Sequence, residues 1–310
     1  MKPTLKFAFD TPDSSKIAAY AWFPNTNKKT WKGVIQIAHG MAEHAQRYGR
    51  FAKVLNEAGY AVYAHDHRGH GQSIHQDSDI GFFAKQNGWR LVIDDTHILN
   101  QRIISDHPTL PITLFSHSMG TFIAQQYAAE YGDTLKGLIL SATIADAGFL
   151  RNIGLIIAKI ERLRIGVRGK SKLLNAMSFG DFNKPFKPNR TEFDWLSRDD
   201  TEVDKYINDP RCGFIVTTQL WIDLLQGLGV MALESTRARV PKDLPILLIT
   251  GTEDPVTKKS KTVDALKQAY EKAGIKSLTV QKYSGGRHES LNEINRDAVT
   301  LDIIEWVNNL

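Results

Sequence analysis

The sequence predicts an α/β protein whose central sheet is mostly parallel, is flanked by helices and is interrupted by a helical insertion. Apolar, β-branched runs alternate with segments in which apolar residues recur at three- and four-residue spacing. Such alternation is typical of a parallel sheet covered on both faces. The alternation stops near residue 146 and resumes near residue 242. With 310 residues, the chain is long enough for a large core with an inserted segment.

The strands expected before the interruption are short apolar runs that end at turn residues. They lie at Leu5–Phe9, Lys16–Trp22, Gly33–Ala38, Tyr60–Ala64, Ile112–Phe115 and Leu135–Ser141. Helices are expected between Tyr48 and Gly59, around Trp89 to Ile103, and directly after Ser118. After the interruption we expect a strand, a helix, a strand and a final helix, at Leu244–Thr250, Lys261–Lys272, Ser277–Tyr283 and Leu291–Val307.

The interruption divides the chain into two predicted parts. Residues 1–145 and 242–310 are expected to form the α/β core. Residues 146–241, with short helical pieces and Pro, Asn and Asp turns, are expected to form a helical cap inserted between two strands. A cap at that place lies over the carboxyl ends of the strands, where open α/β sheets bind ligands.

Composition and charge exclude several classes of protein. The only cysteine is Cys212, so we expect no disulfide framework, no cysteine-based metal site and a buried structural thiol. The net charge of +5 is mild and does not indicate nucleic-acid binding. No run approaches the ~18 apolar residues of a membrane span. Because Met1–Lys6 also lacks the apolar core of a signal peptide, we expect a soluble, cytoplasmic protein, whose oligomeric state the sequence does not set.

The strongest local signal is a serine on a tight turn between a strand and a helix. An apolar run leads into Ser116-His117-Ser118-Met119-Gly120, and helical spacing follows at once. Such a turn exposes a serine hydroxyl as a nucleophile, and its usual pattern is Gly-x-Ser-x-Gly. Because Ser116 replaces the first glycine, the motif alone is also compatible with a plain serine-rich turn.

A nucleophilic Ser118 needs a base, and the base needs an orienting acid. In a sheet with this kind of turn the chain order is serine, acid, histidine. Of ten histidines, nine precede Ser118, which leaves His288, in a Gly-rich loop between the last strand and the last helix. The acid should end an earlier strand, where Asp254 is the candidate and Glu253 its rival.

The oxyanion formed during attack on a carbonyl requires two backbone N–H donors. One is expected from Met119, which follows the nucleophile, and the other from Met41, in the loop after the strand Gly33–Ala38. His39, in the same loop, is expected to have a structural role.

With these pieces placed, the chain resembles an α/β-hydrolase of the monoacylglycerol lipase and lysophospholipase group, which also includes serine-aminopeptidase-like hydrolases. The resemblance spans Leu5 to Val307 and rests on an ordered set of motifs: His39–His44 with Arg47-Tyr48, Asp66–Ser73, Ser116–Gly120, Gly251–Asp254 and His288-Glu289. In the insertion, Phe193–Asp199 and Asp209–Phe214 resemble the cap of bacterial members. Ser116 and Thr121 depart from the usual glycines of the group, but both are small.

The resemblance implies hydrolysis of an acyl ester through an acyl-serine intermediate, without a cofactor. We therefore expect a serine carboxylic ester hydrolase acting on single-chain lipid esters such as a monoacylglycerol or a lysophospholipid. Three alternatives stay open: an aminopeptidase of related fold, a short-chain esterase, and a non-catalytic binding protein. The run His65–His70 approaches a zinc-hydrolase motif, but Gly69 stands where that motif needs Asp, so no metal site is expected.

Two apolar sets in the insertion have alternative interpretations. One follows Phe149 to Ile160 at helical spacing, and six basic residues but one acid lie between Lys159 and Lys172. Such a stretch can make weak peripheral contact with an anionic lipid surface, or it can be a cap helix with a solvated basic face. The second set includes Trp221, Leu224 and Leu225, which are expected either to line the substrate pocket or to pack in the core.

Overall fold

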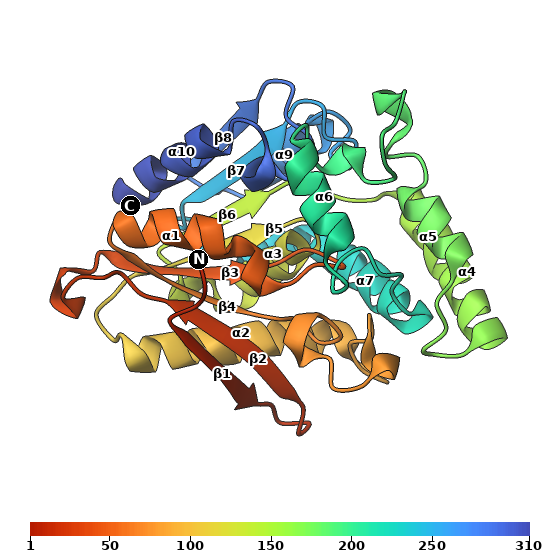
Figure 1. The fold of residues 1–310 in the computed structure, drawn as a ribbon, viewed down its shortest axis with the longest axis horizontal. Coiled ribbons are helices and arrows are strands. Elements are labelled where there is room, and N and C mark those ends of the chain that lie inside the picture. Colours follow the sequence, from red (N-terminus) through yellow and green to blue (C-terminus); the bar gives the residue numbers. More distant parts are fainter.

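The computed structural model describes residues 1–310, and its centre is one eight-stranded sheet. The strand order is β1-β2-β4-β3-β5-β6-β7-β8 (Figure 1). The strands are β1 (Leu5–Asp10), β2 (Lys16–Trp22), β3 (Gly33–Ala38), β4 (Tyr60–His65), β5 (Ile112–His117), β6 (Gly137–Ser141), β7 (Ile246–Gly251) and β8 (Leu278–Tyr283). Strand β2 pairs antiparallel with β1 and β4, and all other neighbours are parallel. The predicted fold class is confirmed.

Helices cover both faces of the sheet (Figure 1). On one face, α1 (Gly49–Glu57) and α10 (Arg296–Asn308) pack on apolar side chains such as Ile35, Phe115 and Ile249. On the other, α2 (Gly88–Asp106), α3 (Met119–Tyr131) and α9 (Lys261–Lys272) form a larger apolar cluster. Every residue of β3 to β7 is buried because both faces are covered, which explains their uninterrupted apolar runs.

Five helices lie between β6 and β7, all within the segment predicted as a cap. They are α4 (Phe149–Ile165), α5 (Lys172–Phe179), α6 (Asp200–Asn208), α7 (Thr218–Met231) and α8 (Glu234–Arg239). Helices α4 and α5 project at one end of the molecule (Figure 1). Helix α7 joins the apolar cluster of α2 and α3 through Leu220, Ile222 and Leu228. None of the helices combines the length and apolar character needed to cross a bilayer. The division into core and cap stays a prediction.

The last helix begins later than the sequence suggests, at Arg296 rather than Leu291. Residues 290–292 form a separate 3-10 turn, and Glu293 follows it. The buried Glu293 carboxylate accepts hydrogen bonds from the backbone N–H groups of Arg198, Arg287 and Ile294. Those bonds, one of them from the distant Arg198, hold the chain in a turn at a place where apolar periodicity alone predicts a longer helix.

Four histidines form a buried cluster beside the ends of β3 and β4. His39, His65, His67 and His70 have no exposed surface, and the rings of His39 and His67 lie 4.2 Å apart between centroids. Burial lowers the pKa of His65 to about 3 and that of His70 to about 4. The same desolvation holds the pKa values of His39 and His67 well below the usual range. All four are therefore neutral at pH 7.

This cluster predicts instability in mild acid. Because the folded pKa values lie below the unfolded value of about 6.5, the unfolded chain binds more protons between pH 6.5 and pH 4. Stability is then full above pH 6.5 and falls as the pH drops toward the folded values, by about 1.4 kcal/mol per pH unit for each histidine. Urea unfolding at pH 7.5, 6 and 5 measures this loss.

The variant His65→Phe removes one titrating ring, whose two nitrogens have no hydrogen-bond partner. It should lose less stability between pH 6.5 and pH 5 than the wild type does. The matched control, His75→Phe, changes an exposed histidine and should keep the wild-type pH dependence. Equal pH dependence in all three proteins would show that the cluster does not cause the acid instability.

Candidate active site

Ser118 occupies the turn between β5 and α3, in a backbone conformation that residues other than glycine rarely adopt. Its φ is 50° and its ψ is −121°. The neighbouring elements fix it there. Its N–H donates to the Ser141 carbonyl of β6 at 2.9 Å, and its carbonyl accepts from the Thr121 N–H at 2.8 Å and the Thr121 hydroxyl at 2.7 Å. Backbone strain of this kind costs about 1–3 kcal/mol, and it is found where surrounding structure holds a functional group in place.

The residues around Ser118 explain which small side chains the turn accepts. A Cβ on Gly120 would lie 2.6 Å from the His39 carbonyl oxygen and would clash with that of Ala38, so only glycine lets α3 approach the end of β3. Ser116 stands where the usual motif has glycine. Its buried hydroxyl donates to the Ile139 carbonyl of β6 at 2.9 Å, so the strand pair satisfies its polar atom.

Ser118, His288 and Asp254 form one hydrogen-bonded chain. The Ser118 hydroxyl lies 3.0 Å from His288 Nε2, and His288 Nδ1 lies 3.1 Å from Asp254 Oδ1. Both His288 and Asp254 are buried. The rival acid, Glu253, is 40 % exposed and pairs with Lys259 at 2.7 Å. The structure thus brings together the three residues inferred from chain order, and Asp254 rather than Glu253 is the carboxylate hydrogen-bonded to His288.

The loop after β3, residues 39–44 (the β3 loop), passes directly beside Ser118. A Cβ on Gly40 would lie 3.3 Å from the Ser118 Cβ. Met41 lines the same cavity as Ser118, and its N–H donates to no other group of the protein. Met119 is the first residue of α3. Of the two expected oxyanion donors, Met119 therefore adjoins Ser118 in the turn, and Met41 lies in the neighbouring β3 loop.

Two buried carboxylates flank Arg47, whose side chain is 13% exposed, and tie the β3 loop to the loop that carries His288. Arg47 donates to Glu43 at 2.6 Å and to both oxygens of Glu289 at 2.7 and 2.8 Å. Burial alone raises the pKa of Glu289, but the charge of Arg47 and its hydrogen bonds lower it to about 2. Glu43 in turn accepts from the Gly40 N–H at 2.6 Å. Sequence patterns indicated none of these pairings.

The segment predicted as a cap also contacts the β3 loop. Ala42 has a φ of 52°. Its carbonyl accepts two hydrogen bonds: one from the Tyr206 hydroxyl of α6 at 3.0 Å, and one from the N–H of Gly213, which follows α6, at 2.9 Å. The Tyr206 ring also stacks on the Arg47 guanidinium, 4.9 Å from its centroid. The conformation of the β3 loop thus depends on cap residues.

Ser118 and His288 open into a cavity of about 740 Å³. Its apolar wall includes Met41, Phe179, Phe193, Trp195, Leu196 and Phe214. Its polar rim comes from the cap: Asn175, Asn183, Lys184, Lys187 and Asn189. The Trp195 ring lies 5.0 Å from the His288 ring between centroids.

Trp221, Leu224 and Leu225 do not line this cavity. The structure places Trp221 and Leu224 in the large apolar cluster, and Leu225 is packed against it. Of the two interpretations of this set, packing in the core is the one that the structure displays. The aromatic residues that do line the cavity were missed, although Trp195 lies in the stretch Phe193–Asp199 that resembled a cap.

Comparisons with known proteins agree with this architecture. Residues 29–295 match the model of the family described as serine aminopeptidase, S33. The chain is 28% identical over 301 residues to a monoacylglycerol lipase of Mycolicibacterium smegmatis, covering 94% of this chain and 92% of that protein. It is 30% identical over 297 residues to the monoglyceride lipase of Homo sapiens, covering 90% and 83%. A crystal structure of a carboxyl esterase from Bacillus coagulans superposes with a TM-score of 0.90 at 27% identity, covering 100% and 99% of the chains.

The hydrogen bonds that link Ser118, His288 and Asp254 predict how fast Ser118 reacts. Asp254→Asn should slow its labelling by a fluorophosphonate about 10²–10⁴-fold, because the amide favours the wrong tautomer of His288. Glu253→Gln, at the exposed neighbour, should label at nearly the wild-type rate. Labelling kinetics by mass spectrometry, with circular dichroism as the check on folding, measure both. The reverse ranking of the two variants would mean that Glu253 is the acid.

Proposed function

The chain belongs to the serine aminopeptidase S33 family of hydrolases, and on that premise we propose that it hydrolyses single-chain lipid esters through an acyl-enzyme intermediate. The observation that carries the proposal is the chain Ser118–His288–Asp254, which opens into a cavity with an apolar wall and a polar rim. A monoacylglycerol or a lysophospholipid has the matching chemistry, with one acyl chain and one polar head group.

In the proposed mechanism, Ser118 Oγ attacks the ester carbonyl and its proton passes to His288 Nε2. Asp254 accepts the Nδ1–H hydrogen bond and stabilises the imidazolium. The carbonyl oxygen, now an oxyanion, accepts hydrogen bonds from the N–H groups of Met41 and Met119. His288 then protonates the departing alcohol, leaving an acyl group on Ser118. A water molecule, deprotonated by His288, releases the fatty acid and restores the serine.

The charges around the cavity favour an ester over a peptide with a free amine. An aminopeptidase needs an unpaired carboxylate for the substrate amine. The carboxylates lining the cavity are Glu43, Glu192 and Glu289, and two of these are paired with Arg47. Glu192 shares the rim with two lysines, so the rim as a whole is basic.

We further propose that α4 and α5 form a face that contacts anionic lipid (the cap face). The apolar side chains on α4 and just after it repeat at alternating four- and three-residue spacing, and all are exposed or partly exposed: Phe149, Ile153, Ile156, Ile160, Leu163 and Val167. Leu173 and Met177 of α5 add to them. Residues 151–172 also carry seven basic side chains and one acid, Glu161.

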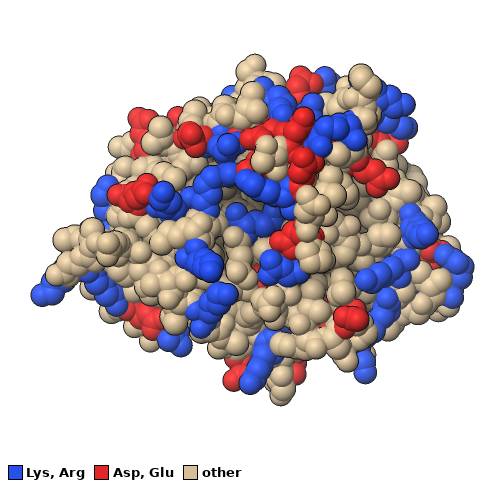
Figure 2. Space-filling view, viewed as in Figure 1, with Lys and Arg blue, Asp and Glu red and all other residues tan.

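The positive charge of the cap face favours anionic lipid as its partner. Figure 2 shows Lys and Arg side chains at the edge of the molecule where Figure 1 places α4 and α5. A second copy of the chain would bring this positive charge against its like, whereas anionic head groups complement it. On α5, Asn175 and Phe179 line the cavity while Leu173 and Met177 are exposed. The cap face therefore lies beside the cavity.

The proposed hydrolysis is tested by the nucleophile. Ser118→Ala should lower the turnover of a p-nitrophenyl ester by about 10⁴-fold or more, while circular dichroism shows an intact fold. Undiminished turnover would refute the proposal, and a wild-type protein without turnover would favour the binding-protein alternative.

A substrate panel on the wild type tests the substrate class. Monoacylglycerols and lysophosphatidylcholine should be better substrates than short esters, and aminoacyl arylamides should be the poorest because the rim is basic. Cleavage of arylamides in preference to esters would assign the protein as an aminopeptidase instead.

The cap face is tested by vesicle sedimentation. The double variant Ile156→Glu, Leu163→Glu should bind anionic vesicles far more weakly than the wild type, because it places charge where 60% and 86% exposed apolar side chains meet the acyl region. The control is Leu301→Glu, at a 61% exposed leucine on α10. Binding that is indifferent to lipid charge or to the double variant contradicts the proposal, and a dimer that the double variant dissociates would identify a second copy as the partner.

A further inference from the structure

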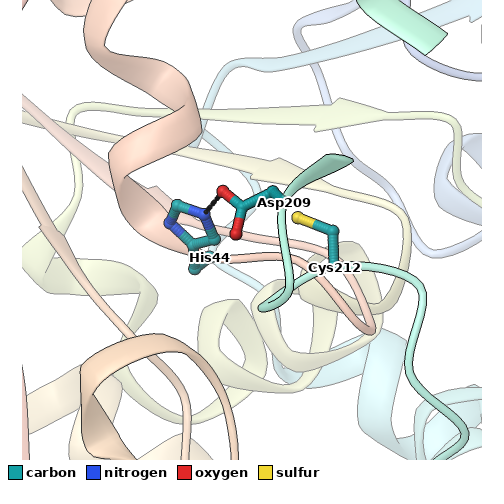
Figure 3. A group of neighbouring side chains, drawn as sticks. All are labelled: His44, Asp209 and Cys212. Carbon is teal, nitrogen blue, oxygen red and sulfur yellow. Dashed lines mark hydrogen bonds and ion pairs between the residues drawn. The ribbon is translucent and has the colours of Figure 1, made fainter. Parts of the chain in front are cut away.

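Outside the cavity, three potential metal ligands converge where the cap meets the β3 loop. His44 closes the β3 loop, Asp209 follows α6, and Cys212 lies in the next turn. One ligand atom from each lies within 4.8 Å of the others. Figure 3 shows the Cys212 sulfur beside the Asp209 carboxylate, which is bonded to the His44 ring. We propose that these three side chains form a site for a thiophilic divalent cation such as Zn²⁺ or Cd²⁺.

These three ligand atoms suit a thiophilic ion better than a hard cation such as Mg²⁺ or Ca²⁺. Imidazole nitrogen, thiolate sulfur and a carboxylate oxygen are all zinc ligands, whereas Mg²⁺ and Ca²⁺ require a shell of oxygen atoms. One thiolate and one carboxylate neutralise a dication. The Asp209 side chain is 23% exposed and Cys212 is partly buried, so an ion can enter from solvent and keep water as its fourth ligand.

The three ligand atoms, which lie within 4.8 Å of one another, must move to the separations of about 3.4–3.6 Å that a tetrahedral site sets. His44 Nε2 lies 2.8 Å from Asp209 Oδ2, with a proton between them. In a tetrahedral zinc site, bond lengths of about 2.0–2.2 Å separate such atoms by about 3.4 Å, so the metal takes the place of that proton. The thiol proton passes to solvent, and the imidazole proton moves from Nε2 to Nδ1.

Two features limit the affinity. His44 Nδ1 is buried without a hydrogen-bond partner, so the metal-bound tautomer leaves an N–H unsatisfied. Arg211 Nη2 also donates to Asp209 Oδ2, at 3.2 Å, and its positive charge opposes a cation. We therefore expect micromolar binding, weaker than that of a dedicated structural zinc site.

Occupation of the site acts on the β3 loop from both sides. His44 directly follows Glu43, whose carboxylate accepts a hydrogen bond from the Gly40 N–H at 2.6 Å. Cys212 directly precedes Gly213, whose N–H donates a hydrogen bond to the Ala42 carbonyl. An ion that widens the gap between His44 and Asp209 and draws Cys212 toward both therefore shifts the loop that carries Met41. This consequence rests on the proposed function: the ion should lower kcat for ester hydrolysis and leave KM nearly unchanged.

Binding is measured on the full chain, freed of metal with a chelator, by titration with Cd²⁺ and detection of the ultraviolet thiolate-to-cadmium band. One Cd²⁺ per chain should produce the band, and Zn²⁺ but not Mg²⁺ should displace it. Cys212→Ser should abolish the band and weaken cadmium binding, followed by calorimetry, more than about tenfold. His75→Asn, at an exposed histidine, should bind as the wild type does. No band, or equal calorimetric affinity in Cys212→Ser, overturns the proposal.

Inhibition is measured separately, as ester hydrolysis with and without Zn²⁺. Cys212→Ser should keep the basal rate, because Cys212 does not line the cavity, and should lose the sensitivity to Zn²⁺. Equal inhibition of this variant and the wild type overturns the coupling to the β3 loop. If the wild type hydrolyses no ester, the proposed function fails, while the cadmium band still decides the existence of the site.

Discussion

The mostly buried side chain of Arg47 makes the contacts on which the candidate active site depends. It pairs with Glu43 of the β3 loop and with Glu289, the neighbour of His288, so it joins two loops far apart in the sequence. Burying three charges is costly unless hydrogen bonds fill the remaining positions. The Tyr48 hydroxyl and the Asn292 amide supply such bonds, at 2.9 and 2.7 Å. The position of His288 relative to the β3 loop therefore follows from one ionic network whose hydrogen bonds are satisfied.

Close packing of backbone supplies the second requirement. Gly120 lets the start of α3 rest on the carbonyl groups that end β3, and this approach turns Ser118 outward. The strain at Ser118 is borne by hydrogen bonds to β6 and to Thr121. Ser116 shows how the turn absorbs a change: a buried hydroxyl is accepted because a carbonyl of the neighbouring strand lies within reach.

Patterns in the sequence predicted those features that depend on neighbouring residues or on the order of residues along the chain. The strands and helices of the core follow from periodicity, and His288 follows from being the only histidine after Ser118. The remainder depends on contacts between distant segments. A helical apolar stripe does not reveal whether Trp221 faces a cavity or the core, and here it packs in the core. Likewise, Glu43 and Glu289 are unremarkable charges in sequence, since their shared partner is known only once the loops meet.

The two hydrogen bonds that the cap makes to the Ala42 carbonyl have a consequence for motion. A displacement of the cap that carried Tyr206 and Gly213 away would leave Ala42 at positive φ without the contacts that hold it there. The segment predicted as a cap and the β3 loop are thus linked by direct hydrogen bonds. Under the proposed function, a movement of this segment would therefore change access to the cavity and the placement of the backbone donors beside Ser118 together.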